Sequence, residues 1–402
     1  MRLSIFVGLL LVVVIDISCA PSADFNNRLN SIVKPYIFSI AGWEIETLIN
    51  ELNRGNLRSY DRIDEEFQTV TEHFSYMERI KELRTEIQSG GRGDTGLDSV
   101  EVELNELERQ KKALAGSVEK IIEVQIRDSL TQHGIFNPIV DLKVSFPPVD
   151  FKLEKTPYLL VISPRERIES IKEVTLKPTL TLKEMNNIEA RVDELDVSSL
   201  VVALGGLGAT FPTLVSGEDD LQSTIDAAIE EWLHQYIGFK PLGFLYLLHI
   251  TGLSRNYEIA NLNETLASMV SKEISSSLYQ KYYSEYELVN GHNQKMGSEI
   301  EFDQQMKEIR NMVDIYLAQG QVRTAEEFME ERSHYLASIG YHIRKLNQAY
   351  FAFYGIYNDS PASVSSIGPD LKKLREQSAS LKDFINRVAA MTSYQELRET
   401  AK

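Results

Sequence analysis

The chain has 402 residues, of which 43% are hydrophobic and 25% are charged, which is the composition of an ordinary globular protein and excludes a disordered chain. It carries 42 Lys and Arg against 59 Asp and Glu, a net charge of −17, and a surface this acidic argues against a nucleic-acid partner. The length predicts one large domain or roughly two to three smaller ones.

The first 23 residues have the pattern of an export signal. Arg2 precedes an apolar run over residues 3–15, which is shorter than the roughly 20 residues that span a membrane and fits a signal peptide. Cys19 is the single cysteine and lies where such a signal is cut. Cys19 is either the lipid acceptor of a bacterial lipoprotein, or the segment is a plain cleaved signal or an uncleaved anchor. Both interpretations predict an exported protein of the cell envelope, membrane-associated or secreted.

Residues 24–134 are predicted to form an N-terminal helical region. Apolar residues recur at helical spacing over 45–52, over 67–77 and again over 97–130. A glycine-rich break over residues 89–96 separates the last two segments. We therefore expect a helical hairpin.

Residues 135–218 are predicted to form one mixed β-sheet. Alternating or short apolar segments occur at 140–146, 149–153, 159–163, 174–182 and 200–204. From residue 219 to residue 402 the chain returns to helical patterns. The predicted fold class is therefore α+β, mostly helical.

The helix expected over residues 219–236 carries a pattern with chemical meaning. Its apolar residues share one face, whereas Glu230 and His234 are four residues apart and lie on the opposite face. Such a pair can bind one metal ion while the neighbouring Glu231 acts as a base. The alternative is an amphipathic surface helix whose polar face is solvated.

Glu264 lies in the middle of a stripe of small residues on the following helix, formed by Ala260, Ala267, Ser271 and Ser275. Small residues let another helix approach closely, so Glu264 is expected to be buried, and buried carboxylates are paired or bind metal. Glu264 is thus a candidate third ligand. The alternatives are a buried salt bridge, or a helix capped by Asn263.

These motifs resemble exported bacterial proteins of the gluzincin kind, which are aminopeptidase-like zinc metallopeptidases. In those proteins a strand with Gly-Gly-Leu-Ala-Thr-Tyr-Pro-Thr precedes a His-Glu-x-x-His helix, followed by Pro-Leu-Gly and Asn-Glu-Thr-x-Ala. Here residues 205–213 read Gly-Gly-Leu-Gly-Ala-Thr-Phe-Pro-Thr, residues 230–234 read Glu-Glu-Trp-Leu-His, and Pro-Leu-Gly at 241–243 and Asn-Glu-Thr-Leu-Ala at 263–267 follow. The resemblance covers residues 135–400 and implies a zincin-like core.

The resemblance implies a metal-dependent hydrolase in which Glu231 is the base and His234 and Glu264 are ligands. Glu230 stands where the family has its first His, and a carboxylate can also bind zinc. Two anionic ligands would favour a harder divalent metal such as Mn²⁺. The predicted function is therefore either an exported metallopeptidase-like protein that hydrolyses peptide bonds, or a catalytically inactive pseudopeptidase that binds peptides or proteins in the envelope.

Two further groups are candidate substrate-binding residues. Gly205 and Gly206 begin a segment expected to form an edge strand beside the active helix, to which an extended peptide can add; the alternative is a strand-to-loop turn. The segment 343–355 also resembles the family and places Arg344, Asn347 and Tyr350 on adjacent helical turns. These three residues contact substrate in one interpretation, and the surrounding aromatic run is simply core in the other.

Overall fold

The computed structural model describes residues 23–39, 43, 63–88, 94–139, 143, 145–290, 295–356, 363 and 365–402. The apolar N-terminal segment, Cys19 and the helix predicted around residues 45–52 lie outside these ranges. Over the described residues the fold is α+β and mostly helical with small sheets, which confirms the predicted class. None of the helices in these ranges is both long and apolar enough to cross a membrane.

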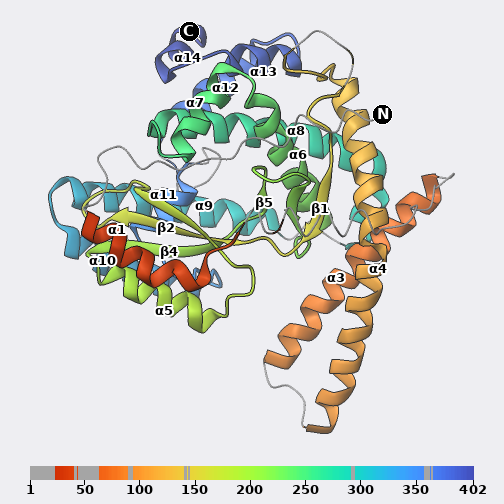
Figure 1. Ribbon diagram of the computed structural model, residues 1–402, viewed down its shortest axis with the longest axis horizontal. Coiled ribbons are helices and arrows are strands. Elements are labelled where there is room, and N and C mark those ends of the chain that lie inside the picture. The colour runs from red at the N-terminus through yellow and green to blue at the C-terminus, as the bar shows by residue number, and fades with distance from the viewer. Residues whose placement is uncertain are drawn as a thin grey trace.

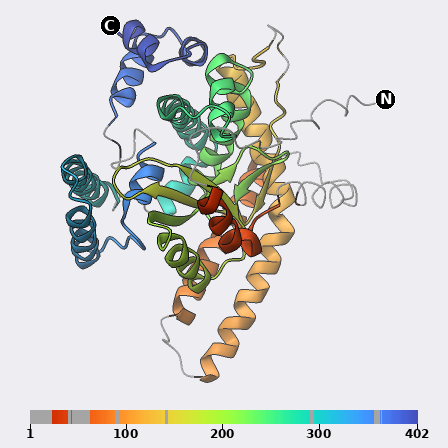
Figure 2. The same ribbon diagram turned by 60° about the vertical axis from the view of Figure 1, so that its left-hand side comes forward.

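A long helix hairpin projects from the body of the molecule (Figures 1 and 2). It consists of α3 (Ile63–Gln88) and α4 (Asp94–Gln132), so the predicted hairpin is confirmed. Apolar side chains from both helices enter one core, namely Val70, Phe74, Met77, Val118 and Ile122. Ion pairs between Arg79 and Glu103 (2.9 Å) and between Arg84 and Glu108 (3.0 Å) join the exposed sides.

One three-stranded sheet is antiparallel and has the order β3-β2-β4. Its strands are β2 (Tyr158–Pro164), β3 (Lys172–Leu176) and β4 (Val197–Ala203). One face packs against α1 (Ala23–Val33), which is followed by the 3-10 turn η1 (Lys34–Tyr36), and against α5 (Leu182–Asp193). The other face is covered by α11 (Gln348–Tyr354).

The second sheet is mixed and has the order β1-β6-β5. β1 (Phe151–Glu154) runs parallel to β6 (Thr213–Ser216), and β6 pairs antiparallel with β5 (Gly206–Leu207). β5 is therefore an edge strand, as expected, but it has only two residues, and residues 208–212 of the predicted segment form a turn as in the alternative interpretation. β5 packs against α6.

The prediction of one sheet for residues 135–218 is wrong in two respects. The strands form two sheets, because strand pairing is interrupted both at residues 155–157, which lie between β1 and β2, and at residues 204–205, which lie between β4 and β5. The helix α5 also interrupts the region, and its start is stabilised by a capping box between Thr181 and Glu184. The segment 140–146 lies partly outside the described residues.

The rest of the chain is helical, as predicted. Its first three helices are α6 (Leu221–Ile237), α7 (Pro241–Ile250) and α8 (Tyr257–Asn290), and α6 and α8 share the largest core with the α3–α4 hairpin. The later helices are α9 (Lys295–Ala318), α10 (Val322–Ser338), α11, α12 (Ile367–Glu376), α13 (Leu381–Ala389) and α14 (Tyr394–Thr400).

Candidate metal centre

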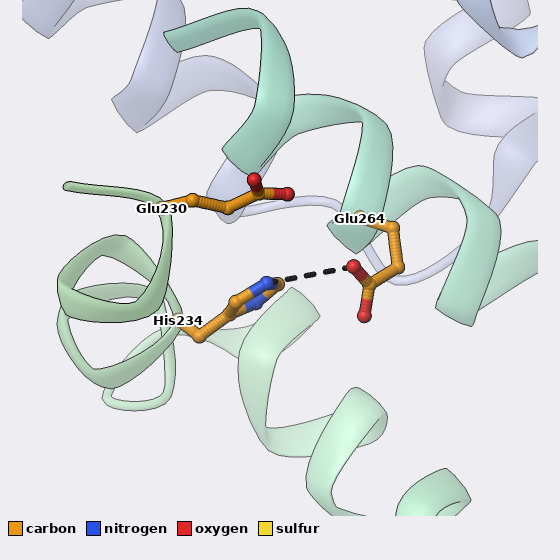
Figure 3. A group of neighbouring side chains, drawn as sticks. All are labelled: Glu230, His234 and Glu264. Atoms are coloured by element: carbon orange, nitrogen blue, oxygen red, sulfur yellow. Dashed lines mark ion pairs between the residues drawn. The ribbon is translucent and has the colours of Figure 1, made fainter. Parts of the chain in front are cut away.

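The orientation of α6 follows from its sequence. Asp220 caps the helix by accepting a hydrogen bond from the backbone N–H of Ser223 (2.9 Å). The apolar face is buried in the core through Ile225, Ile229, Trp232, Leu233 and Tyr236. Glu230 and His234 therefore project from a different face, one helical turn apart, toward α8 (Figure 3).

The stripe of small residues on α8 lies where the sequence predicts it. Ala260, Ala267, Ser271 and Ser275 are each at most 2% exposed, and α8 packs closely against α6. Ser275 Oγ lies 3.2 Å from Asp226 Oδ1 on α6. This close approach brings Glu264 to the face of α6 that carries Glu230 and His234.

Glu230, His234 and Glu264 converge on a common point between the two helices (Figure 3). One potential ligand atom from each residue lies within 4.8 Å of the others, and His234 Nε2 lies 3.5 Å from Glu264 Oε2. Ligands of a tetrahedral zinc ion at bond lengths of about 2.1 Å are separated by roughly 3.4 Å, so small side-chain rotations bring all three into range. Since the three side chains face one another, the solvated-face interpretation of Glu230 and His234 is wrong.

Two further side chains hold His234 and Glu264 in place. His234 Nδ1 lies 2.8 Å from Asn263 Oδ1, so the ring donates through Nδ1 and directs Nε2 toward Glu264. The Tyr246 ring stacks on the His234 ring at a centroid distance of 5.5 Å, and its hydroxyl donates to Glu264 Oε1. Asn263 lies inside α8, so the interpretation of this residue as a helix cap is wrong.

Glu231 lies against the edge strand rather than against the other carboxylates. The backbone N–H of Gly208 donates to Glu231 Oε2 at 2.6 Å. A Cβ atom on Gly206 would lie 2.5 Å from Glu231 Cγ, and one on Gly208 would lie 2.8 Å from the backbone oxygen of Glu231. These two positions require glycine because strand and helix touch there, whereas a Cβ on Gly205 would make only ordinary contact with Ala227.

The electrostatics of the site favour cations. Burial raises the pKa of Glu230 to about 8 and that of Glu231 to about 7. Burial alone would lower the pKa of His234, but Glu264, Glu231 and Glu230 outweigh it and raise that pKa to about 10. The cluster therefore retains protons near neutral pH to offset its carboxylates. A divalent cation can replace those protons, so the donor set fits such an ion.

The residues predicted to bind substrate near the C-terminus lie beside β4 and not within this cluster. Arg344 donates to Glu189 at 2.5 and 2.9 Å and to the backbone oxygen of Val201. Asn347 caps α11, because its side chain accepts from the Tyr350 N–H at 2.9 Å. Tyr350 lines a cavity next to β4.

No protein-family model, curated protein or solved structure matches the chain.

Proposed function

We propose that this protein is a metal-dependent peptidase of the gluzincin kind with a zincin-like core, exported to the cell envelope. The observation that carries the proposal is the convergence of Glu230, His234 and Glu264 within 4.8 Å. Glu231 contacts the edge strand and lies close enough to His234 and Glu264 for their charges to act on its pKa. A metal site, a base and a peptide-binding edge in one place are what peptide hydrolysis requires.

Glu230, His234 and Glu264 would hold the metal, which is Zn²⁺ or a harder divalent ion because two ligands are anionic. A bound ion of this kind polarises a carbonyl group and lowers the pKa of water. The Nδ1–H of His234 is held by Asn263 (2.8 Å). That hydrogen bond fixes the ring so that the lone pair of Nε2 faces the metal position.

Glu231 is the proposed general base. Burial raises its pKa to about 7, so it can accept a proton from water and release it near neutral pH. The Gly208 N–H holds Oε2 and leaves the second oxygen for this transfer. The Tyr246 hydroxyl donates its single proton to Glu264 and so holds that carboxylate in place as a ligand.

The substrate in this proposal is an extended peptide that pairs with the edge strand β5. Gly206 and Leu207 pair with β6 on one side only. The Gly208 N–H and carbonyl are already bonded to Glu231 and Gln235, so in this proposal the peptide pairs with the edge at Gly206 alone. The absence of a side chain on Gly206 keeps the peptide close to Glu231. The Gly205 carbonyl accepts from the Ser216 N–H at 2.8 Å and therefore faces β6, not the outer edge.

The proposal is tested by the metal content of the purified chain, measured by elemental analysis. We expect about one divalent ion per chain and almost none in Glu264→Ala, because this variant removes one of three protein ligands. Glu273→Ala is the matched control, since Glu273 lies on the same helix but pairs with Arg375 at 2.7 Å. Metal-free wild-type protein, or equal metal content in the two variants, would overturn the proposal.

A second candidate function, a pseudopeptidase that binds peptide without cleaving it, is favoured by Glu230. A carboxylate at this position makes a Zn²⁺ site formally neutral, and the water there is then a weaker acid than at a site of neutral ligands. Glu230→His separates the two functions in an assay with a fluorogenic peptide library. Activity that appears only in Glu230→His supports the pseudopeptidase, whereas cleavage by the wild-type chain supports the enzyme.

A further inference from the structure

The helix α7 is apolar on every side, yet the rest of the protein covers only part of it. Its ten residues read Pro-Leu-Gly-Phe-Leu-Tyr-Leu-Leu-His-Ile, and only Leu242 and Gly243 are buried. The helix packs on α6, α8 and α13, and Figure 1 shows it near α13. A helix that is apolar all round is normally enclosed. The open side of α7 therefore indicates an apolar partner outside the described residues.

The open side of α7 carries a continuous row of apolar side chains. Phe244, Leu247 and Ile250 recur at every third residue and so are neighbours along the helix. Phe244 is 57% exposed and Ile250 is 49% exposed. Phe239 lies just before the helix and Leu253 just after it, and both are about half exposed. We call these five residues the α7 strip.

The strip is a concentration of exposed apolar surface and not part of a general scatter. Twelve large hydrophobic residues are exposed in the described part of the chain, and four of them fall within residues 239–253. The ring of Phe239 also lies 5.3 Å from the ring of Phe146, so the strip begins at an aromatic pair. Single exposed apolar residues need no explanation, whereas a contiguous group marks a site of interaction.

The charge around the strip is opposite to that of the whole chain. No Asp or Glu occurs between Glu231 and Glu258, although the chain contains 59 of them. Within this stretch Lys240 precedes α7 and Arg255 follows it, and neither forms an ion pair within the described residues. Arg255 interacts electrostatically with Glu173 on β3, so Lys240 is the freer of the two cations. Positive charge thus flanks the strip in an otherwise acidic protein.

These features fit an anionic lipid membrane better than a protein. A membrane takes apolar side chains into its hydrocarbon boundary and pairs flanking cations with its headgroups. A protein partner is usually also held by hydrogen bonds, and the side chains of the strip offer none. A second copy of the chain would bring another net charge of −17 against the first. The apolar run over residues 3–15 already predicts that the chain meets a membrane.

We propose that the α7 strip is a docking surface for an anionic membrane, with Lys240 and Arg255 at the level of the lipid phosphates. Tyr246 lies on the opposite side of α7 from Phe244 and contacts Glu264 in the metal cluster. Docking therefore holds that cluster about one helix diameter, or roughly 10 Å, from the membrane surface. The inference rests on exposure and charge and does not need the proposed function.

Tryptophan fluorescence tests the proposal in the full chain, with vesicles of equal parts phosphatidylcholine and phosphatidylglycerol. Phe244→Trp places a reporter in the strip. Vesicles with brominated acyl chains quench a tryptophan that enters the bilayer. We expect them to lower the fluorescence of Phe244→Trp by about one third more than that of the wild type, because docked side chains lie about 5–10 Å into the boundary. Leu253→Trp is a second reporter and should behave in the same way.

Ile315→Trp is the matched control, because Ile315 lies on α9 and is 47% exposed. All variants keep the same N-terminal segment, so any attachment through that segment is common to them. Ile315→Trp should be quenched no more than the wild type. Quenching of both strip reporters at the wild-type level, or equal quenching of Ile315→Trp and Phe244→Trp, would overturn the proposal.

The role of charge is tested by sedimentation with the same vesicles. Lys240→Glu should weaken binding by about tenfold, because a cation near the headgroups becomes an anion. Lys307→Glu makes the same change in net charge at an exposed position on α9 and should leave binding near the wild-type level. Equal binding by the two variants would contradict the proposed orientation.

The other occupant gives a different result. If the wild type is a dimer in sedimentation velocity, Phe244→Ser makes it a monomer and neither strip reporter is quenched, the strip joins two copies and the membrane proposal falls. The proposed function can also fail separately. A chain that shows the quenching but binds no metal keeps the docking surface and loses the hydrolase, and a metal-binding chain without quenching does the reverse.

Discussion

Two helix pairs, α3–α4 and α6–α8, each bury a histidine, and the two histidines have opposite pKa shifts. His73 is 1% exposed, and its Nδ1 lies 3.1 Å from the Lys111 carbonyl oxygen. Burial and the charge of Lys111 lower its pKa to about 4. The pKa of His234 is raised to about 10, because three carboxylates outweigh burial. The surroundings of His73 favour its neutral ring, whereas the surroundings of His234 favour its positively charged, protonated ring.

The carboxylates of the two helix pairs differ in the same way. On α4, Glu119 pairs with Lys152 at 3.1 Å and also accepts the Leu153 N–H at 3.0 Å, so the buried charge has partners that hold β1 in place. Glu230 on α6 has no hydrogen bond or ion pair within the described part of the chain. A structural carboxylate comes with its counter-charge, whereas the α6–α8 cluster leaves room for a cation from outside.

The largest effect expected from this difference concerns Glu231. Glu231→Gln keeps the shape of the side chain but cannot accept a proton, so peptide cleavage should fall by roughly 10²- to 10⁴-fold. Metal content should stay unchanged, because Glu231 is not among the proposed ligands. The measurement is kcat/KM for a fluorogenic peptide together with elemental analysis. Unchanged cleavage would show that Glu231 is not the general base.

His73 provides a test in the other helix pair, through the free energy of unfolding. Its folded pKa of about 4 lies below the usual 6.5, so its contribution is fully present above pH 6.5 and is lost as the pH falls toward 4. Acidification from pH 7 to 4.5 should destabilise the wild type by about 2 kcal/mol more than His73→Gln. Urea unfolding followed by circular dichroism measures both. Equal pH dependence would show that His73 is not held neutral.

The convergence of Glu230, His234 and Glu264 could be predicted because it depends mainly on helical periodicity. Four-residue spacing places Glu230 and His234 on one face of α6, and the small residues of α8 predict that Glu264 is buried against another helix. No long-range information is needed beyond the pairing of two successive long helices. The glycines at 206 and 208 are a second local signal, since they mark the contact with Glu231.

The contact between Tyr246 and Glu264 could not be predicted from the sequence, because the direction of the Tyr246 side chain depends on the turn between α6 and α7. Gly243 packs so tightly there that a Cβ atom would lie 2.2 Å from the Ile237 oxygen. In an apolar helix, sequence alone does not show which residue this turn will aim at Glu264.

The start of α5 could have been predicted from sequence, because Thr181 and Glu184 form a capping box. The split of the strands into two sheets could not be predicted, because strand pairing is set by contacts between residues distant in sequence.

The third prediction concerns Asn263, the residue that orients His234. Asn263→Ala removes the acceptor of the Nδ1–H (2.8 Å) and should weaken metal binding by about 10- to 100-fold. The loss of folding stability should be small, because two costs offset each other. The variant leaves the His234 Nδ1–H without its acceptor, but it also removes Asn263 Nδ2, which is buried without a partner in the described residues. Competition with a chelator measures the affinity, and circular dichroism measures the melting temperature.

His73→Gln is the control for this measurement, because it changes a buried histidine in the other helix pair and should leave metal affinity unchanged. Asn263→Asp retains an acceptor for Nδ1–H and should recover most of the lost affinity, which a merely structural role for Asn263 does not predict. If Asn263→Ala binds metal as tightly as the wild type, His234 does not bind through Nε2. The contrast between the two histidines would then reflect an ion pair with Glu264 (3.5 Å) and not a metal site.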